Sequence, residues 1–229
     1  MADKIEYELV RMKRKTISIE ITKAAGVLVK APRQLAPATV DAFVARKSNW
    51  ITETRQRVLE ENRKKENFDP LRSQSLLFLG KEYPVQTADD PDAAPLFDGA
   101  RFLLPARPFS QLRPLLVALY KQLAEAVITE RVHYYAALMG VRPSFVKITS
   151  AKTRWGSCSG KNGICFSWKL IFAALSAVDY VVVHELAHIR EHNHSARFWA
   201  VVSGVLPDYR QRQSMLKQLQ QRLNGEQWE

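Results

Sequence analysis

Residues 180–194, YVVVHELAHIREHNH, carry the most informative pattern in this chain. They open with an apolar run of helical character. Two histidines four residues apart on a helix project from one face, one turn apart, so His184 and His188 are placed to bind the same zinc ion. Glu185 lies between them and is placed to reach a water molecule on that ion. The pattern is typical of zinc hydrolases, usually of peptidases.

The third ligand must come from outside this helix. A catalytic zinc ion needs three protein ligands and one position for water. A residue two turns after His184 would lie ~12 Å along the axis, too far to share the ion. The chain must therefore turn back, and Asn193 tolerates the left-handed conformation that ends helices. We predict His194 as the third ligand, because it has the ten-residue offset of the pattern HExxHxxGxxH.

Two other residues compete with His194 for this position. His192 lies four residues after His188, but too far along a continuing helix, and Glu191 points to a different helix face. His192 is better interpreted as a solvated residue near the helix end, where a positive charge is favourable. A chance HExxH on a buried helix is the structural alternative. Three well-spaced histidines among the five in the chain argue against it.

Composition and length are those of an ordinary soluble globular protein of 229 residues. No apolar stretch approaches the ~20 residues of a membrane span, and the first residues mix acids and bases without the apolar centre of a secretory signal. We therefore expect a cytoplasmic protein without a membrane partner. Cys158 and Cys165 lack CxxC spacing and are expected to be free thiols. The oligomeric state is not indicated.

The net charge of +11 is unevenly distributed. Residues 101–161 hold ten Lys and Arg against two Glu, whereas residues 73–100 are net acidic. A concentrated basic region suggests an anionic partner such as nucleic acid, or an acidic substrate. A solvated helix face in a basic protein is the simpler interpretation, because the chain has no nucleic-acid-binding fingerprint.

The N-terminal part is predicted to combine a β-hairpin with a long helix. Alternating isoleucines in residues 16–29, interrupted by an Ala-Ala-Gly turn, indicate the hairpin. An amphipathic helix is expected from about Thr39 to Lys65, with Trp50 as a packing anchor. A second β region is expected in residues 76–85, and residues 88–100 are predicted to be a loop or linker.

The C-terminal part is predicted to hold a helix at about 114–139, ended by Gly140, and strands at 146–149 and 164–170. A glycine- and serine-rich loop separates the strands. The zinc helix follows, and a last helix begins near Pro207. Ser176 and Asp179 resemble a capping box at the start of the zinc helix.

Four motifs occur in a specific order along the second half of the chain. They are TRWGSC at 153–158, GICFSWKLI at 163–171, VDYVVVHELAHIREHNHSARFW at 178–199 and LPDYRQR at 206–212. These motifs resemble those of the YgjP-like metallopeptidases, which are similar to the SprT and Wss1-like zinc proteases. The resemblance extends from about Lys15 to Leu223 and departs from the usual family pattern at Ser167 and Ala174.

This resemblance implies an α+β fold with a minimal zincin-like metallopeptidase core, formed by a small sheet and the zinc helix. An N-terminal lobe with the β-hairpin and the long helix precedes it. It also favours His194 over His192 as a ligand. We expect one domain over residues 15–223, made of an N-terminal β/α lobe (about 1–104) and a catalytic lobe (about 105–229).

The predicted function is zinc-dependent hydrolysis of peptide bonds, with one Zn²⁺ per chain. Glu185 would act as the general base for a zinc-activated water. Tyr209 and Arg154 are candidates to stabilise the oxyanion or to contact the substrate. The strand from Gly163 to Leu170 would pair with an extended protein or peptide substrate. The loop before this strand, through Trp155, would then shape specificity. Core packing of Trp155 under the zinc helix is the alternative, and it is the one we expect.

Three other functions are compatible with parts of the sequence. In the first of these, the chain would dock on DNA through residues 101–161. DNA docking and peptide hydrolysis would be combined if the chain cleaves DNA-bound proteins, as related SprT and Wss1-like proteins do. A hydrolase of non-peptide amides or esters would activate water in the same way. A zinc-stabilised structural protein is the fourth reading, but a structural site has no use for Glu185.

Overall fold

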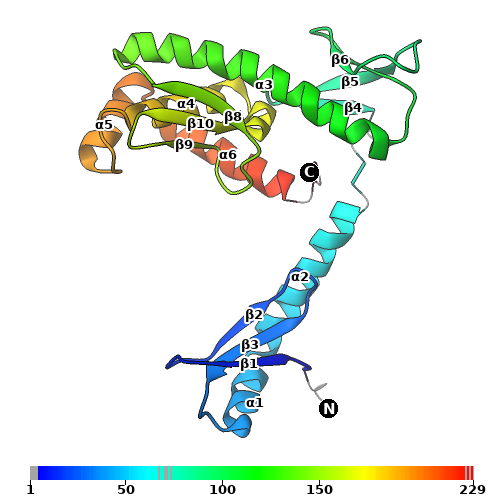
Figure 1. Cartoon of the computed structure of the whole chain (residues 1–229), viewed down its shortest axis with the longest axis vertical. Coiled ribbons are helices and arrows are strands. Elements are labelled where there is room, and N and C mark those ends of the chain that lie inside the picture. Colours follow the sequence, from blue (N-terminus) through cyan, green and yellow to red (C-terminus); the bar gives the residue numbers. More distant parts are fainter. Residues whose placement is uncertain are drawn as a thin grey trace. The chain divides into compact units, whose positions relative to one another are not determined.

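The computed structural model describes residues 5–66, 68, 69, 72, 74–224, 226 and 228, which form two compact units (Figure 1). The first unit reaches to Phe68, and the second extends from Asp69 to Leu223 and includes Trp228. Both units combine helices with sheets, so the predicted α+β class is confirmed. In the described part of the chain, no helix has the length and apolar character needed to cross a membrane.

The first unit is a three-stranded sheet with two helices. Its strand order is β1-β3-β2, with β1 parallel and β2 antiparallel to β3, so the predicted hairpin is confirmed. Alternate residues of β3 are buried and pack against apolar residues of the helices. The elements are β1 (Glu8–Met12), β2 (Ser18–Ile21), β3 (Val27–Pro32), α1 (Pro37–Arg46) and α2 (Ser48–Glu66).

The long helix expected from Thr39 to Lys65 is two helices, because α1 ends at Arg46, with Lys47 as its C-cap, and α2 starts at Ser48. The residues around this break include neither proline nor glycine, so the sequence carried no signal for it. The prediction for Trp50 was wrong. Its side chain is 45% exposed, and Ile51 beside it is the buried residue that packs in the core.

The second unit begins with a four-stranded sheet of order β4-β5-β7-β6. Its strands are β4 (Ser75–Phe78), β5 (Lys81–Thr87), β6 (Leu96–Phe97) and β7 (Phe102–Leu104). The predicted β region at 76–85 is the antiparallel β4–β5 pair, whereas the predicted loop at 88–100 contains the short strand β6. The turn between β4 and β5 donates backbone hydrogen bonds from Leu79 and Gly80 to the carbonyls of Ile171 and Phe172.

An aromatic cluster joins this sheet to the rest of the second unit. Tyr120 contacts Phe102, Trp168, Phe172 and Trp228, with ring centroids 4.8 to 6.0 Å apart. Large buried aromatic rings dominate the energetics of such cores. For this reason the compact units divide at Asp69, well before residue 104, where the sequence analysis expected the boundary between the lobes. A single domain over 15–223 stays a prediction.

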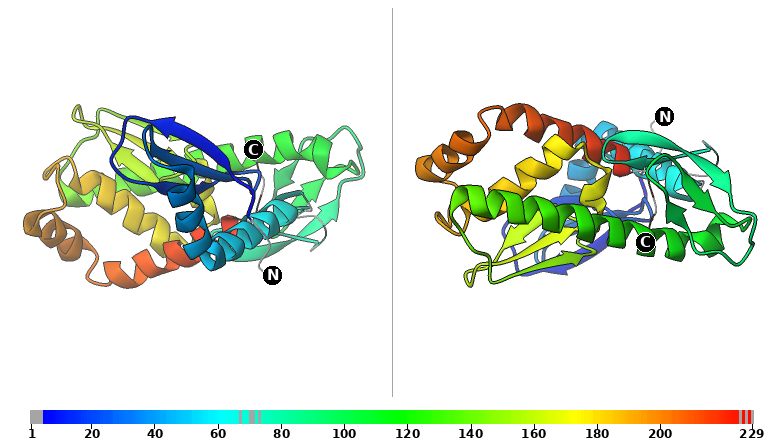
Figure 2. Two further views of the ribbon diagram at one scale, coloured as in Figure 1. Left: turned by 90° about the horizontal axis from the view of Figure 1, so that it is seen from below. Right: turned by 90° about the horizontal axis from the view of Figure 1, so that it is seen from above.

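The remainder of the second unit is a small sheet with helices. The strand order is β8-β10-β9, and α3 lies alongside both α4 and β8 (Figure 2). Helix α3 begins five residues before the predicted Pro114 and ends as predicted, with Gly140 in the left-handed conformation (φ 60°). The elements are α3 (Phe109–Met139), β8 (Phe145–Thr149), β9 (Gly156–Cys158), β10 (Gly163–Ser167), η2 (Trp168–Phe172), α4 (Leu175–Ala187), α5 (Ala196–Val205) and α6 (Tyr209–Leu223).

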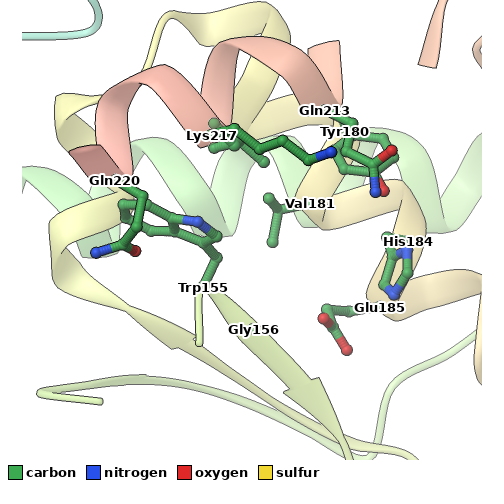
Figure 3. Close-up of a pocket in the computed structure, with 10 residues that line it drawn as sticks. Trp155, Gly156, Tyr180, Val181, His184, Glu185, Gln213, Lys217 and Gln220 are labelled. Atoms are coloured by element: carbon green, nitrogen blue, oxygen red, sulfur yellow. The ribbon is translucent and has the colours of Figure 1, made fainter. Parts of the chain in front are cut away.

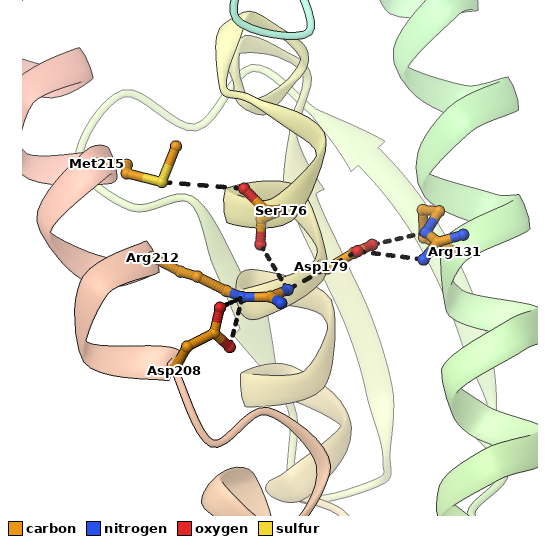
Figure 4. Close-up of polar contacts among 6 residues, drawn as sticks. All are labelled: Arg131, Ser176, Asp179, Asp208, Arg212 and Met215. Atoms are coloured by element: carbon orange, nitrogen blue, oxygen red, sulfur yellow. Dashed lines mark hydrogen bonds and ion pairs between the residues drawn. The ribbon is translucent and has the colours of Figure 1, made fainter.

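Helix α4 is held by ion pairs and not by the predicted capping box. Its N-cap is Ala174, which makes no side-chain cap, so Ser176 already lies within the first turn. Asp179 instead accepts two hydrogen bonds from Arg131 of α3, at 2.6 and 3.1 Å (Figure 4). On the other side, Arg212 of α6 donates to the Ser176 carbonyl and to Asp208. These contacts fix α4 between α3 and α6.

Substitution of Asp179 by alanine is expected to destabilise the second unit by about 3 kcal/mol, because it leaves the largely buried Arg131 guanidinium without its carboxylate. Urea unfolding followed by circular dichroism measures the loss. Glu82→Ala is the matched control, since it breaks the exposed pair with Arg222 and is expected to cost less than about 1 kcal/mol. Equal losses in the two variants would refute the role given to the Arg131–Asp179 pair.

Candidate metal centre

Three histidines from one helix and the turn after it converge on one point. His184 lies in the last turn of α4, and His188 is the residue that ends the helix. The chain then turns, and Asn193 Oδ1 accepts a hydrogen bond from the backbone N–H of Ser195, which caps α5. This turn returns His194 to the end of α4, as the ten-residue offset predicted.

The geometry of the three imidazoles fits a metal ion. Nε2 of His194 lies 3.1 Å from Nε2 of His184, and one ring nitrogen from each of the three histidines lies within 4.8 Å of the other two. Zinc binds imidazole nitrogen at about 2.0–2.1 Å in a tetrahedral arrangement, which places ligand nitrogens about 3.3 Å apart. The nitrogen donors and their spacing therefore suit zinc.

The ring of Phe198 of α5 packs against all three imidazoles. Its ring centroid lies 4.9 Å from that of His184, 4.5 Å from His188 and 4.8 Å from His194, and the residue is fully buried. The sequence analysis gave Phe198 no role. Phe198 lies three residues after the capping Ser195, and its ring faces α4. This orientation depends on how α5 packs against α4, which no local pattern indicates.

The two rivals for the third position lie outside the cluster. His192 is exposed and is not one of the three convergent histidines. Glu191 contributes its backbone carbonyl, which lies 3.2 Å from Nδ1 of His188. A hydrogen bond at this nitrogen orients the ring and leaves the other nitrogen free to bind a metal.

The carboxyl group of Glu185 is buried beside the cluster, and the residue is 6% exposed. Burial raises the pKa of Glu185 to about 7, although the positive charge of Arg154 opposes this shift. Burial also lowers the pKa of His184 to about 4, aided by the charges of His188 and His194. Neutral imidazole is the form that binds metals. A divalent cation at the three histidines would lower the pKa of Glu185 again.

Gly156 of β9 leaves the space that Glu185 fills. A Cβ atom at position 156 would lie 2.7 Å from both Cγ and Oε1 of Glu185. We expect Gly156→Ala to displace this carboxyl group and to lower turnover by about 100-fold, since misplacement by about 1 Å has effects of this size. Metal content, measured by elemental analysis, should not change.

Gly160→Ala is the control for this substitution, because a Cβ there meets no atom within 4 Å. It is expected to keep full turnover. Full activity in Gly156→Ala would show that Glu185 does not need its observed position.

Tyr209 lies in a stack of aromatic rings behind the site. Its ring stacks on Tyr180 (6.4 Å between centroids) and on Trp199 (5.2 Å), and Trp199 stacks in turn on His194 (5.9 Å). The hydroxyl of Tyr209 accepts a hydrogen bond from Arg210. The ring of Tyr209 is thus held by stacking, with one ring, that of Trp199, between it and His194. A role of Tyr209 at the oxyanion stays a prediction.

Arg154 and Trp155 precede β9. Arg154 is exposed, and its charge acts on the carboxyl group of Glu185. The prediction that Trp155 packs in the core was wrong. Its half-buried side chain lines a pocket of about 330 Å³ that also contains His184 and Glu185 (Figure 3).

Tyr180 is a candidate site residue that the sequence analysis missed. It lies four residues before His184, on the same face of α4, and lines the same pocket. Burial, together with the charges of Tyr209 and Glu185, raises the pKa of Tyr180 to about 12. Its phenol is protonated at neutral pH, as that of an ordinary tyrosine is, and stays so in more alkaline solution, so it is able to donate a hydrogen bond. The four-residue spacing was the available signal.

The substrate strand predicted from Gly163 to Leu170 is wrong in two respects. The strand β10 ends at Ser167, and it lies in the middle of its sheet, hydrogen-bonded to β8 and β9 on its two sides. In the described residues the strand with an unpaired edge next to Glu185 is β9. A three-residue segment, Gly-Ser-Cys, has no strand pattern of its own and becomes a strand only by pairing with β10.

Part of the basic region 101–161 is neutralised within the fold. Arg101 pairs with Asp98, Arg107 with Asp92, and Arg131 with Asp179. Binding of nucleic acid through this region stays a prediction.

Comparison with known proteins gives one family. A family model described as "YgjP-like, metallopeptidase domain" matches residues 15–219. No curated protein matches the chain significantly. Among solved structures, the metallopeptidase zymogen abylysin of Pyrococcus abyssi is 21% identical, over 42% of this chain and 94% of its own, with a TM-score of 0.37. A TM-score of this size supports no conclusion about the fold of this chain.

Proposed function

The chain belongs to the YgjP-like metallopeptidase family, and on this premise we propose that it hydrolyses peptide bonds with a zinc ion held by His184, His188 and His194. The observation that carries the proposal is the convergence of three imidazole nitrogens, all within 4.8 Å, beside a buried carboxyl group. A structural site would be closed by a fourth protein ligand, whereas three ligands leave a position for water.

Glu185 performs the proton transfer in this proposal. Zinc, when bound, lowers the pKa of a coordinated water to about 7 and polarises a carbonyl group. The Glu185 carboxylate takes the proton of the attacking water and delivers it to the nitrogen of the leaving amine. Its burial supports this role, because a carboxylate that is poorly solvated is a stronger base. Gly156 permits the carboxyl group to lie where it does.

Substrate orientation is assigned to β9 and Tyr180. The unpaired edge of β9 offers backbone donors and acceptors to an extended peptide next to Glu185. The protonated Tyr180 hydroxyl is proposed to donate a hydrogen bond to the developing oxyanion, a role that the sequence analysis gave to Tyr209 or Arg154. Tyr209 is proposed to support Tyr180 by stacking on it.

The test is hydrolysis of an unfolded protein such as casein by the zinc-loaded chain, followed by mass spectrometry of the products. New internal termini, lost on chelation and regained with zinc, are the expected result. Intact casein in the presence of fully zinc-loaded protein would contradict the proposal.

A further inference from the structure

The pocket beside Glu185 is large enough to admit any single side chain. It is an open depression of about 330 Å³, at the lower end of the range for ligand pockets. Its walls come from the start of β9, from α4 and from α6, and His184 and Glu185 lie at one end (Figure 3). A side chain next to the scissile bond would enter it directly.

The inner wall of the pocket is apolar. Trp155, Val181 and Leu216 line it, and Val181 and Leu216 are 4% and 5% exposed. Such a surface favours methylene groups over water, at roughly 25 cal/mol per Å² of apolar area buried. The stem of the bound side chain is therefore aliphatic or aromatic.

The rim of the pocket is polar and carries a positive charge. Gln213, Lys217 and Gln220 lie at i, i+4 and i+7 on α6, so they share one face of that helix. Lys217 forms no ion pair with any described residue, and among the lining residues only Glu185 is acidic. Amide and ammonium groups at these positions suit an anionic tip.

The helices α5 and α6, which include this rim, carry more basic than acidic residues. Residues 196–223 carry one acidic residue, Asp208, and it is paired with Arg212. Arg222 also has a partner, Glu82, so the positive charge that lines the pocket itself is that of Lys217, which favours an anionic group there. The basic residues of this segment are Arg197, Arg210, Arg212, Lys217 and Arg222.

We propose that this pocket is a specificity site for a carboxylate carried on an apolar stem, so that the enzyme prefers substrates with glutamate beside the cleaved bond. The inference rests on the proposed function and names its substrate class. Trp155, Val181 and Leu216 contact the methylene groups, and Lys217 pairs with the carboxylate.

The test compares peptides that differ only in Glu, Gln, Lys or Leu beside the cleaved bond, using zinc-loaded protein. Wild type should cleave the Glu peptide with the highest kcat/KM. Lys217→Glu should lower the ratio of kcat/KM for Glu over Lys by about tenfold, since an exposed ion pair accounts for a few-fold with each substrate. Lys217 is exposed, so the substitution should not affect folding.

Lys147→Glu is the matched control, because Lys147 is exposed on β8, at the opposite edge of the sheet from β9. It should leave the ratio unchanged. An unchanged ratio in Lys217→Glu would overturn the inference. A preference that follows a free C-terminal carboxylate, and is lost when the peptide end is amidated, would also overturn the side-chain assignment.

Binding separates this inference from the proposed function. Fluorescence anisotropy measures the affinity of labelled Glu and Lys peptides for zinc-loaded Glu185→Gln protein. Tighter binding of the Glu peptide, abolished in the double variant with Lys217→Glu, supports the pocket even if wild type cleaves nothing, in which case the proposed function alone fails. Equal binding of the two peptides overturns the pocket even where wild type cleaves both.

Discussion

Glu185→Gln is expected to keep its zinc and to lose hydrolysis by about 10²- to 10⁴-fold, the range for removal of a general base. Glutamine has nearly the same shape as glutamate, so the space left by Gly156 stays filled and the buried environment is unchanged. It cannot accept the proton of the attacking water. The three imidazoles of the proposed metal site are untouched. Elemental analysis and the turnover of casein give the two readouts.

Glu191→Gln is the control for this substitution. It also removes an acid near the cluster, but Glu191 contacts His188 only through its backbone carbonyl. Both zinc content and turnover should therefore remain. Full turnover in zinc-loaded Glu185→Gln would argue against Glu185 as the base, and loss of zinc from this variant would show instead that Glu185 helps to hold the metal.

The convergence of the three histidines could be predicted from sequence because its geometry is mostly local. The spacing of His184 and His188 is set by the period of one helix, and His194 is separated from them by a short turn. The family motifs then added the order of the surrounding elements. The positions of these three histidines depend on few contacts between distant parts of the chain, so the local sequence nearly determines them.

The surroundings of the cluster depend on packing and were mostly missed. Gly156 looked like one of several loop glycines, and its role follows from how β9 approaches α4. The side chain of Trp155 faces a pocket completed by α6, more than 50 residues later in the chain. Tyr209 was considered for its chemistry, whereas the structure gives it stacking partners.

The errors in the fold have the same cause. The capping prediction for Ser176 and Asp179 used a local pattern, but Arg131, 48 residues earlier, binds the Asp179 carboxylate. The division between the compact units depends on an aromatic cluster around Tyr120 that links the β4–β7 sheet to α3. Composition along the chain cannot locate such contacts.

His194→Ala is expected to lower the affinity for zinc by more than about 100-fold, and turnover with it. Loss of a residue that merely orients a ligand costs 10–100-fold, and removal of a ligand should exceed this. His194 is exposed and follows the end of α4, so the fold of the helix should remain. Zinc content after dialysis and competition with a chelator of known affinity measure the effect.

His192→Ala separates this role from a general effect of removing a histidine. His192 is two residues away, is also exposed and lies outside the cluster, so zinc content should be unchanged. Because the space left by His194→Ala is open to solvent, added imidazole should restore part of the zinc binding in that variant. The opposite pattern, with zinc retained in His194→Ala and lost in His192→Ala, would move the third ligand to His192. It would also require the turn after α4 to differ from the one in which Nε2 of His194 lies 3.1 Å from Nε2 of His184.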